Sequence, residues 1–242
     1  MKIATWNVNS LRVRLPHLTD WLAANPLDAI ALQETKLPDA DFPVADLQAL
    51  GWNAVCSGQR TYNGVAILSR EPAKDVVAGI PGFEDEQRRV LAASLGGLRV
   101  VDVYVPNGQT VGSDKFEYKL RWLAALREYV AAELARHPHL VVLGDFNVAP
   151  EDRDVHDPKA WEGSVHVSPP ERAALQALLG TGLADCFRLF EQPEKSYSWW
   201  DYRMMAFRRN AGLRIDLILA STALAQKCGG CHIDKAPRKL ER

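Results

Sequence analysis

Residues 140–147 read Leu-Val-Val-Leu-Gly-Asp-Phe-Asn, a continuous apolar run that ends in a carboxylate and an amide. Short apolar runs of this length, closed by a loop, indicate buried strands. Three other apolar runs lead into an acid, an amide or a phenol in the same way, and their polar ends are Asn7, Glu34 and Tyr104. Because strand ends converge at one edge of a sheet, the sequence predicts that these polar side chains gather at a single site.

Crowded carboxylates at such an edge predict a bound cation. Anions held close together repel one another unless a positive charge lies between them. Carboxylate and amide oxygens are the ligands that a hard cation prefers, so the sequence predicts Mg²⁺ (or Mn²⁺) at this edge. The expected chemistry is a metal-assisted reaction at a phosphate.

The apolar pattern recurs along the chain and favours an α/β fold. Two polar turns, one of them Gly96-Gly97, predict antiparallel hairpins. Helices and hairpins are mixed rather than strictly alternating, which favours two packed mixed sheets with outer helices. The predicted strands are Lys2–Val8, Asp28–Gln33, Trp52–Ser57, Gly64–Ser69, Arg89–Leu95, Leu98–Val105, Leu140–Gly144 and Leu213–Ala220, and the predicted helices are Val13–Ala24, Lys115–Arg136 and Glu171–Leu179.

Composition limits the classes of protein to which the chain can belong. With 47% hydrophobic residues and seven tryptophans, it can fill a substantial core. Its longest apolar stretches are only strand-sized, which argues against a membrane span, and the first strand pattern begins without a signal-peptide pattern before it. We therefore expect a cytoplasmic protein that has no membrane partner.

The four cysteines fit a reducing compartment. Cys56 and Cys186 stand alone among apolar residues and are expected to be small core side chains. Cys228 and Cys231 form a Cys-Gly-Gly-Cys pair beside His232, in a strand-like context. A structural zinc site needs four ligands and the chain has no second pair, so we interpret this pair as structural.

The net charge of −1 is unevenly spread along the chain. Residues 195–242 carry ten basic and four acidic residues. A basic region suits a polyanionic substrate that must approach an acidic site, although the same pattern is typical of a solvated surface. The polar loop at residues 150–163 follows Asp145 and is expected either to overhang the site or to be a mobile surface loop.

Seven motifs follow one another in the order and spacing of a known family. They are Trp6 to Ser10, Gln33 to Lys36, Asn63 to Ile67, Tyr104 to Gly108, Gly144 to Asn147, Ser198 to Arg203 and Leu213 to Asp216. Together they resemble exonuclease III, the apurinic/apyrimidinic endonuclease branch of the endonuclease/exonuclease/phosphatase superfamily. The resemblance covers essentially the whole chain.

The resemblance implies one domain over residues 1–242 with a deoxyribonuclease I-like fold. This fold is a four-layer α/β sandwich of two mixed sheets flanked by helices. The implied activity is that of a divalent-metal-dependent DNA repair phosphodiesterase. It would cut the backbone on the 5′ side of abasic sites, act as a 3′-to-5′ exonuclease and trim 3′ ends. We expect a monomer whose partner is double-stranded DNA with abasic sites or 3′ ends.

Chemistry and the resemblance together assign roles to the polar residues. The expected metal ligands are Asn7, Glu34, Asp145 and Asn147. Asp145 is also the candidate general base or acid, and Asn147 and Tyr104 are expected to donate hydrogen bonds to the phosphate. Asp216 matches the acid that, in the family, holds a histidine against the scissile phosphate.

The resemblance also implies substrate contacts. Trp199, Leu213 and Ile215 match positions around the pocket that accepts a flipped sugar without its base, and the alternative is that they are ordinary core residues. Asn107 belongs to the same expected substrate-binding set. The expected phosphate contacts are Arg203, Arg208, Arg209 and Arg214.

The chain departs from the family near its end. The family's last strand begins with a Ser-Asp-His run that supplies a carboxylate and the histidine partnered by the acid at Asp216. The sequence reaches Arg242 without this run or that strand. Two explanations stay open: the chain is part of a longer, active enzyme, which we favour, or it ends at Arg242 and is a damage-binding protein with impaired hydrolysis. A phosphohydrolase of the same superfamily with another substrate is a separate alternative.

Overall fold

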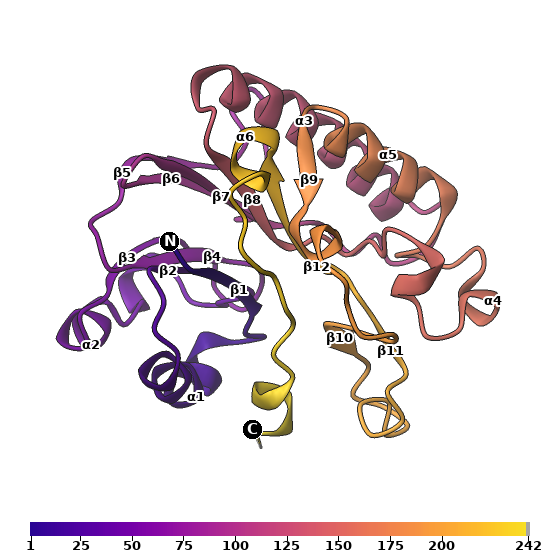
Figure 1. Ribbon diagram of the computed structural model, residues 1–242, viewed down its shortest axis with the longest axis horizontal. Coiled ribbons are helices and arrows are strands. Elements are labelled where there is room, and N and C mark those ends of the chain that lie inside the picture. Colours follow the sequence, from indigo (N-terminus) through magenta and orange to yellow (C-terminus); the bar gives the residue numbers. More distant parts are fainter. Residues whose placement is uncertain (241–242) are drawn as a thin grey trace. The chain divides into compact units, whose positions relative to one another are not determined.

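The computed structural model describes residues 1–240, which form two compact units (Figure 1). Unit 1 contains Met1–Tyr104, His139–Asp145 and the chain from Asp234 onward. Unit 2 contains Val105–Pro138 and Phe146–Ile233. Among residues 1–240, no helix is both long enough and apolar enough to cross a membrane.

Unit 1 contains two groups of four hydrogen-bonded strands. The first has the order β1-β2-β4-β3, in which β1 and β2 are parallel and the other pairs are antiparallel. The second runs β5-β6-β7-β8, in which only β7 and β8 are parallel. The strands are β1 Ile3–Asn7, β2 Ala29–Gln33, β3 Asn53–Ser57, β4 Val65–Ser69, β5 Lys74–Ala78, β6 Val90–Leu95, β7 Leu98–Tyr104 and β8 Leu140–Asp145.

Two helices cover one face of the first sheet of unit 1 (Figure 1). They are α1 (Leu11–Ala24) and α2 (Val44–Ala49), and short 3₁₀ turns lie at η1 (Asp39–Asp41) and η4 (Ala236–Lys239). Leu18 of α1 and Leu47 of α2 are completely buried in a cluster with Leu32 of β2. This burial of apolar side chains provides the main stabilisation of the layer.

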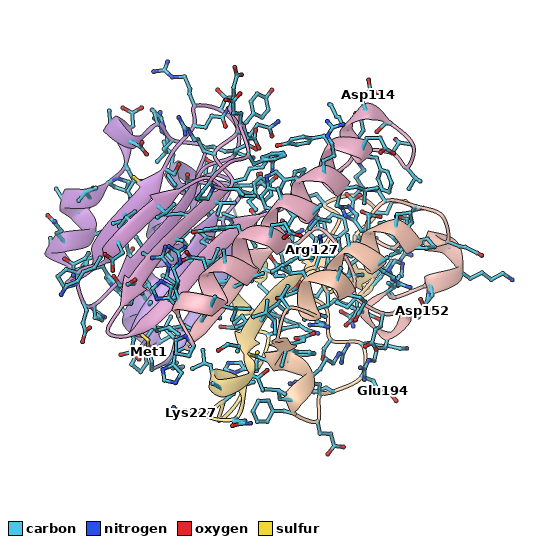
Figure 2. The ribbon with its side chains drawn as sticks, turned by 90° about the horizontal axis from the view of Figure 1, so that it is seen from above. Met1, Asp114, Arg127, Asp152, Glu194 and Lys227 are labelled. Carbon is cyan, nitrogen blue, oxygen red and sulfur yellow. The ribbon has the colours of Figure 1, made fainter. Side chains whose placement is uncertain are left out.

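Unit 2 contains two long helices that run side by side, α3 (Asp114–Arg136) and α5 (Pro169–Leu179) (Figure 2). Ser113 caps α3, because its side chain accepts a hydrogen bond from the backbone N–H of Phe116 at 3.2 Å. The pairs β9–β12 and β10–β11 are antiparallel. The remaining elements are η2 Asp152–Asp154, α4 Pro158–Trp161, β9 Leu183–Asp185, η3 Cys186–Leu189, β10 Trp199–Trp200, β11 Gly212–Leu213, β12 Asp216–Ser221 and α6 Thr222–Ala225.

The structure corrects the strand that was predicted at residues 213–220. Its first part is β11 and its second part is β12, with a break at Arg214 and Ile215. The side-chain oxygen of Ser198 accepts the N–H groups of Ile215 and Asp216 at 3.1 and 3.0 Å, so these N–H groups bind a side chain rather than a neighbouring strand. The strand-like context predicted around His232 is also wrong, because residues 228–235 form no strand.

Arg214 is a structural residue, and its expected phosphate contact is wrong. Its side chain is 1% exposed, and its guanidinium contacts Asp154 at 2.6 Å and Asp185 at 2.7 Å. Arg188 also pairs with Asp154, which is itself fully buried. A buried guanidinium whose charge is matched by two carboxylates cannot reach a ligand. The network anchors η2, so the polar loop at residues 150–163 is held to unit 2 rather than free of it.

Asp102 of β7 is a buried acid inside unit 1. It is 0% exposed, and the side-chain amide of Gln33 donates to it at 2.7 Å. Burial raises the pKa of Asp102 well above its usual value, while the Gln33 hydrogen bond partly opposes this shift. The carboxyl group is therefore held in its protonated form over a wider pH range than an exposed aspartate.

Candidate active site

Three polar side chains of unit 1 meet at the ends of their strands. Asn7 ends β1, Glu34 directly follows β2, and Asp145 ends β8. The side-chain amide nitrogen of Asn7 donates to Glu34 Oε1 at 2.8 Å and to Asp145 Oδ2 at 2.9 Å. One amide group thus bridges two carboxylates that are 111 positions apart in the sequence. This is the convergence that the strand-end pattern predicts.

The backbone at Glu34 has an unusual conformation that fixes the direction of its side chain. Its φ of 54° lies in the left-handed region, which side chains other than glycine seldom adopt. The Glu34 carbonyl accepts the N–H of Ser10 at 2.8 Å, which ties this turn to the segment after β1. Lys36 pairs with the Glu34 carboxylate at 2.9 Å and also donates to Asn9 at 2.5 Å. Residues in strained conformations of this kind cluster at functional sites.

Tyr104 of β7 lies beside the two carboxylates. It is paired in register with Asp145, and its hydroxyl forms a side-chain hydrogen bond with Glu34. Burial raises the pKa of Tyr104 strongly, and the negative charges of Glu34 and Asp145 raise it further. The guanidinium of Arg89 lies 4.5 Å from the centre of the ring and opposes this shift only in part. The phenol therefore stays protonated and acts as a hydrogen-bond donor.

Gly144 permits a close approach of β8 to β7 immediately before Asp145. Its φ is 145°, and a Cβ atom at this position would lie 1.9 Å from the carbonyl oxygen of Val103. No side chain fits such a gap. The position of Asp145 therefore depends on a glycine at residue 144.

The donor set of unit 1 fits a hard divalent cation. Two carboxylate oxygens lie within hydrogen-bonding distance of one amide group, and their charges are only partly offset by Lys36. Mg²⁺ is typically bound by one or two carboxylates and retains several waters. Within residues 1–240, no group of three or more His, Cys, Asp or Glu side chains is arranged to hold a metal ion. The residues that would hold Mg²⁺ or Mn²⁺ are thus Glu34 and Asp145, with Asn7 between them.

Asn107 and Asn147 lie together in unit 2. The Asn107 amide nitrogen lies 3.5 Å from Asn147 Oδ1, and the Asn147 amide nitrogen donates to the carbonyl oxygen of Val105 at 2.9 Å. Asn147 is 5% exposed and has a φ of 50°, so its side chain is fixed by both packing and backbone. A side-chain amide nitrogen is a hydrogen-bond donor, so the fixed amide of Asn147 is a candidate group for binding a phosphate oxygen.

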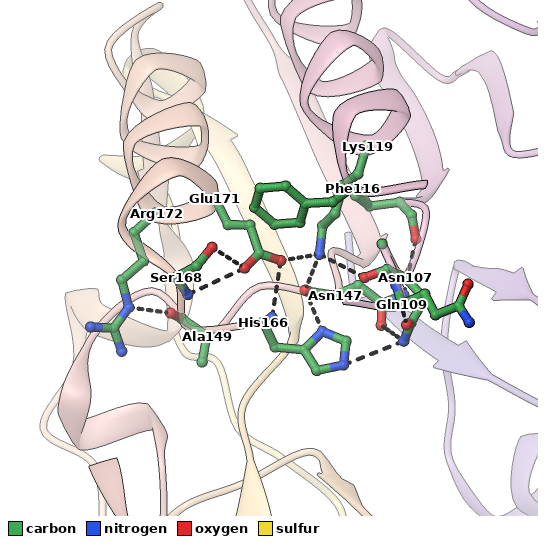
Figure 3. Close-up of polar contacts among 12 residues, drawn as sticks. Asn107, Gln109, Phe116, Lys119, Asn147, Ala149, His166, Ser168, Glu171 and Arg172 are labelled. Atoms are coloured by element: carbon green, nitrogen blue, oxygen red, sulfur yellow. Dashed lines mark hydrogen bonds and ion pairs between the residues drawn. The ribbon is translucent and has the colours of Figure 1, made fainter. Parts of the chain in front are cut away.

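A buried lysine binds the backbone carbonyls of both asparagines (Figure 3). Lys119 of α3 is 0% exposed, and its ammonium donates to the carbonyl oxygens of Asn147 at 2.7 Å and Asn107 at 3.1 Å. It also forms an ion pair with Glu171, the carboxylate that caps α5. Glu171 accepts the backbone N–H groups of His166 at 2.9 Å and Ser168 at 3.2 Å. Lys119 and Glu171 therefore tie two helices to the loops that carry both asparagines.

His166 completes the support of the two asparagines. Its Nδ1 lies 2.6 Å from the carbonyl oxygen of Asn147, and its Nε2 lies 3.3 Å from the side-chain nitrogen of Asn107. Burial, and then the positive charge of Lys119, lower the pKa of His166 to about 4. The imidazole is therefore neutral at pH 7. Because a carbonyl oxygen only accepts, we assign the proton to Nδ1 and the acceptor role to Nε2.

The three residues expected to line a sugar pocket share one apolar cluster of unit 2. Leu213 and Ile215 are 0% and 2% exposed and pack with Val155, while Trp199 is only partly buried at the edge of the cluster. The Trp199 ring lies 6.3 Å from that of His166. In this arrangement Leu213 and Ile215 contact the chain's own side chains, and Trp199 is the member of the set that a ligand can reach.

The other predicted residues of unit 2 lie in different settings. Asp216 begins β12, with its backbone N–H bonded to Ser198. Arg203 lies in an exposed turn between β10 and β11, where Met204 and Tyr202 are 79% and 57% exposed. Arg208 and Arg209 are exposed in the same segment, which leaves these arginines available for phosphate contacts, unlike Arg214.

Comparison with known proteins places the chain among metal-dependent phosphoesterases. The sequence profile of the Endonuclease/Exonuclease/phosphatase family matches residues 4–238. The chain belongs to this family. Exodeoxyribonuclease III of Haemophilus influenzae is 35% identical over 255 residues, which include all of this chain and 96% of that protein.

Two solved structures resemble the whole chain. A 3′ phosphatase from Neisseria, bound to a product DNA hairpin, is 50% identical, has a TM-score of 0.98, and matches 100% of this chain and 95% of its own. An AP endonuclease from Archaeoglobus fulgidus is 39% identical, has a TM-score of 0.96, and matches 100% of this chain and 94% of its own. These likenesses confirm the predicted fold class, the α/β sandwich of mixed sheets flanked by helices.

Proposed function

We propose that the protein is a divalent-metal-dependent DNA repair nuclease that hydrolyses phosphate esters beside abasic sites and at the 3′ ends of duplex DNA. The contact that carries the proposal is the amide of Asn7, which holds the carboxylates of Glu34 and Asp145 side by side. The names of the relatives support DNA as the substrate: an exodeoxyribonuclease, a 3′ phosphatase with bound DNA, and an AP endonuclease.

In this proposal the residues of unit 1 bind the cation and activate water. Glu34 and Asp145 would hold Mg²⁺ or Mn²⁺ through their oxygens, with Asn7 fixing the distance between them. When bound, the cation would polarise a phosphate oxygen and offset its charge. Asp145 accepts the proton of the attacking water, and Tyr104, which stays protonated, donates a hydrogen bond where negative charge develops.

For unit 2 we propose contacts with the phosphates of DNA. Asn147 donates a side-chain hydrogen bond to a phosphate oxygen, and Asn107 contacts the substrate beside it. The Lys119 ammonium holds both backbone carbonyls in place, so the amides need little reorganisation during the reaction. Asn147 was also predicted as a metal ligand, and its bond to Val105 through nitrogen leaves its oxygen turned toward Asn107. We therefore favour its donor role.

Replacement of Asp145 by Asn tests the proposal most directly. The amide keeps the shape of the side chain but accepts no proton, so turnover should fall by roughly 10²–10⁴-fold. Binding of an abasic duplex should be largely retained. The matched control is Asp46→Asn, at an exposed position on α2. Wild-type turnover by Asp145→Asn with either metal would exclude Asp145 as the proton acceptor.

Removal of phosphate from 3′ ends is the second candidate as the main activity. It is favoured by the name of the Neisseria relative at 50% identity and by the burial of Leu213 and Ile215 within the chain's own apolar cluster. Two substrates separate the candidates: a duplex with one internal abasic analogue and a duplex that ends in a 3′-phosphate. Strand nicking supports abasic cleavage, whereas phosphate release without nicking supports the 3′-phosphatase.

Further properties of the chain belong to the same proposal. We propose that it acts as a monomer in the cytoplasm, and that both units form one domain, because the family profile spans both of them. The preferred metal is Mg²⁺, with Mn²⁺ as substitute. Tight binding of abasic duplex without turnover in either metal would instead favour the damage-binding alternative.

A further inference from the structure

Three of the four cysteines gather in unit 2, although the sequence separates them. Cys186 begins η3, whereas Cys228 and Cys231 follow α6. All are free thiols. The thiol of Cys228 is close enough to that of Cys186 for a side-chain hydrogen bond, and Cys231 lies close enough to affect the ionisation of Cys186. Cys186 is buried, as expected of a small core residue, but it does not stand alone, because the other two thiols lie beside it.

Hydrogen bonds hold the two cysteine-bearing segments together independently of the thiols. The side-chain nitrogen of Gln192 donates to the carbonyl oxygen of Phe187, which follows Cys186, at 2.8 Å and to that of Cys231 at 2.9 Å. The backbone N–H of Cys228 donates to Ala225 at 3.1 Å. A single amide nitrogen thus bonds both segments, so the thiols are neighbours because of the fold.

The chemistry of the cluster fits oxidation better than metal binding. The described residues contain no group of three metal-binding side chains in a suitable arrangement. The neighbouring carboxylate of Asp185 is already bonded to Arg214 at 2.7 Å and to the N–H of Phe187 at 3.1 Å. Burial raises the pKa of the Cys231 thiol to about 12, and it raises that of Cys186 as well. Because the thiolate is the form that binds a metal, thiols that stay protonated disfavour a metal site here.

We propose that Cys186 and Cys228 form a reversible disulfide when the protein meets hydrogen peroxide. Cys228 is half-buried and reachable by a small oxidant, whereas Cys186 is only 4% exposed. The Cys228 thiolate attacks one peroxide oxygen, breaks the O–O bond and becomes a sulfenic acid, and the released hydroxide takes up a proton to become water. The Cys186 sulfur then attacks the sulfenic sulfur, loses its proton and expels a second water.

The reaction balances without any further reagent. Two thiols and one peroxide give one disulfide and two waters; the two sulfurs lose two electrons, which the peroxide oxygens gain. A dithiol reductant reverses the bond by exchange. The bond would join the start of η3 to the segment after α6. η3 directly follows β9 and α6 directly follows β12, the two strands that pair with each other.

Peptide mapping of the full chain tests the proposal. Purified protein is exposed to peroxide, its remaining thiols are alkylated, and it is digested with trypsin without reduction. Cys186 lies in the peptide of residues 173–188, and Cys228 and Cys231 share the peptide of residues 228–235. We expect these two peptides to be linked and the number of free thiols to fall from four to two. A dithiol reductant should release both peptides.

Single variants identify the bonded pair. The linked peptides should persist in Cys231→Ser and disappear in Cys228→Ser, whose half-buried site tolerates the change. Cys56→Ser, on β3 of unit 1, is the matched control and should oxidise like wild type. A bond between Cys228 and Cys231 within one peptide, sulfinic acids without linked peptides, or protection of the thiols by a bound zinc ion would each overturn the proposal.

Discussion

Replacing Lys119 with Met removes the ammonium that supports Asn107 and Asn147 and leaves a side chain of similar length. Breaking a buried ion pair from one side costs about 3–5 kcal/mol, because the remaining charge is left uncompensated. Here the remaining carboxylate of Glu171 keeps two backbone N–H donors, and the Asn147 carbonyl keeps the His166 ring. We therefore expect the loss to be near the lower limit, about 3 kcal/mol in the free energy of unfolding.

Urea unfolding followed by tryptophan fluorescence measures this loss, with Lys115→Met as the control. Lys115 lies one turn earlier on α3 and is exposed, so its replacement should change stability by less than about 0.5 kcal/mol. Lys119→Arg should not restore the wild type, because Lys119 is 0% exposed and its closely packed site leaves little room for the larger guanidinium.

Turnover gives the second readout for Lys119. Loss of support for the two amides should lower kcat more than it raises KM, because the donors are then misplaced in the transition state. If Lys119→Met unfolds with the same urea midpoint as Lys115→Met, the ion pair with Glu171 contributes no net stability and the reasoning fails. A double-mutant cycle with Glu171→Gln measures the coupling between the two residues directly.

Three further replacements test contacts in the two units. Asn7→Asp places a third anion between Glu34 and Asp145, so the metal-free variant should melt at a lower temperature than metal-free wild type. Added Mg²⁺ should raise the melting temperature of the variant by more than that of wild type. Equal Mg²⁺-dependent shifts in the two proteins would contradict this. The raised pKa of Asp102 means that the folded state keeps a proton that the unfolded state releases above its ordinary pKa of 3.8. The stability that Asp102 contributes is therefore complete below that pH and is lost as the pH rises. Urea midpoints from pH 5 to 7 should fall less steeply in Asp102→Asn than in wild type, and parallel profiles would refute the shift. The pH dependence of stability from His166 has the opposite sign, because folding lowers its pKa from 6.5 to about 4. The stability that His166 contributes is present above pH 6.5 and is lost by up to about 1.4 kcal/mol per pH unit as the pH falls toward 4. His166→Gln should remove this dependence on acid pH.

Much of the fold follows from hydrophobic pattern alone, and the failures have physical causes. Buried strands such as β8 stand out because both faces are covered and the run is continuously apolar. β5 was not predicted, since its residues Lys74–Ala78 are mostly exposed and carry a mixed pattern. The break at Arg214 and Ile215 depends on the distant Ser198 hydroxyl, which accepts the N–H groups of Ile215 and Asp216 and which no local pattern contains.

The candidate site was also predicted from the sequence only in part. Parallel neighbours end at one edge, which accounts for Asn7 beside Glu34 in one sheet and for Tyr104 beside Asp145 in the other. That these two sheet edges meet depends on packing within unit 1, which the strand-end pattern does not contain. Lys119 was missed because lysine on a helix is usually solvated. A signal was present: Lys119 lies three residues after Phe116 and four before Leu123, on the stripe that the structure buries. A charge on an apolar stripe indicates a buried partner, although the sequence cannot name Glu171 as that partner.

Gly144 limits how this chain can diverge. A methyl group there would overlap the oxygen of Val103, and a backbone shift large enough to relieve the overlap would move Asp145 with it. In a saturation library selected for nuclease function, codon 144 should therefore retain only glycine while neighbouring codons vary. Its retention can serve as an internal standard: survivors with any other amino acid at this codon would indicate that selection was too weak to report on the chemistry.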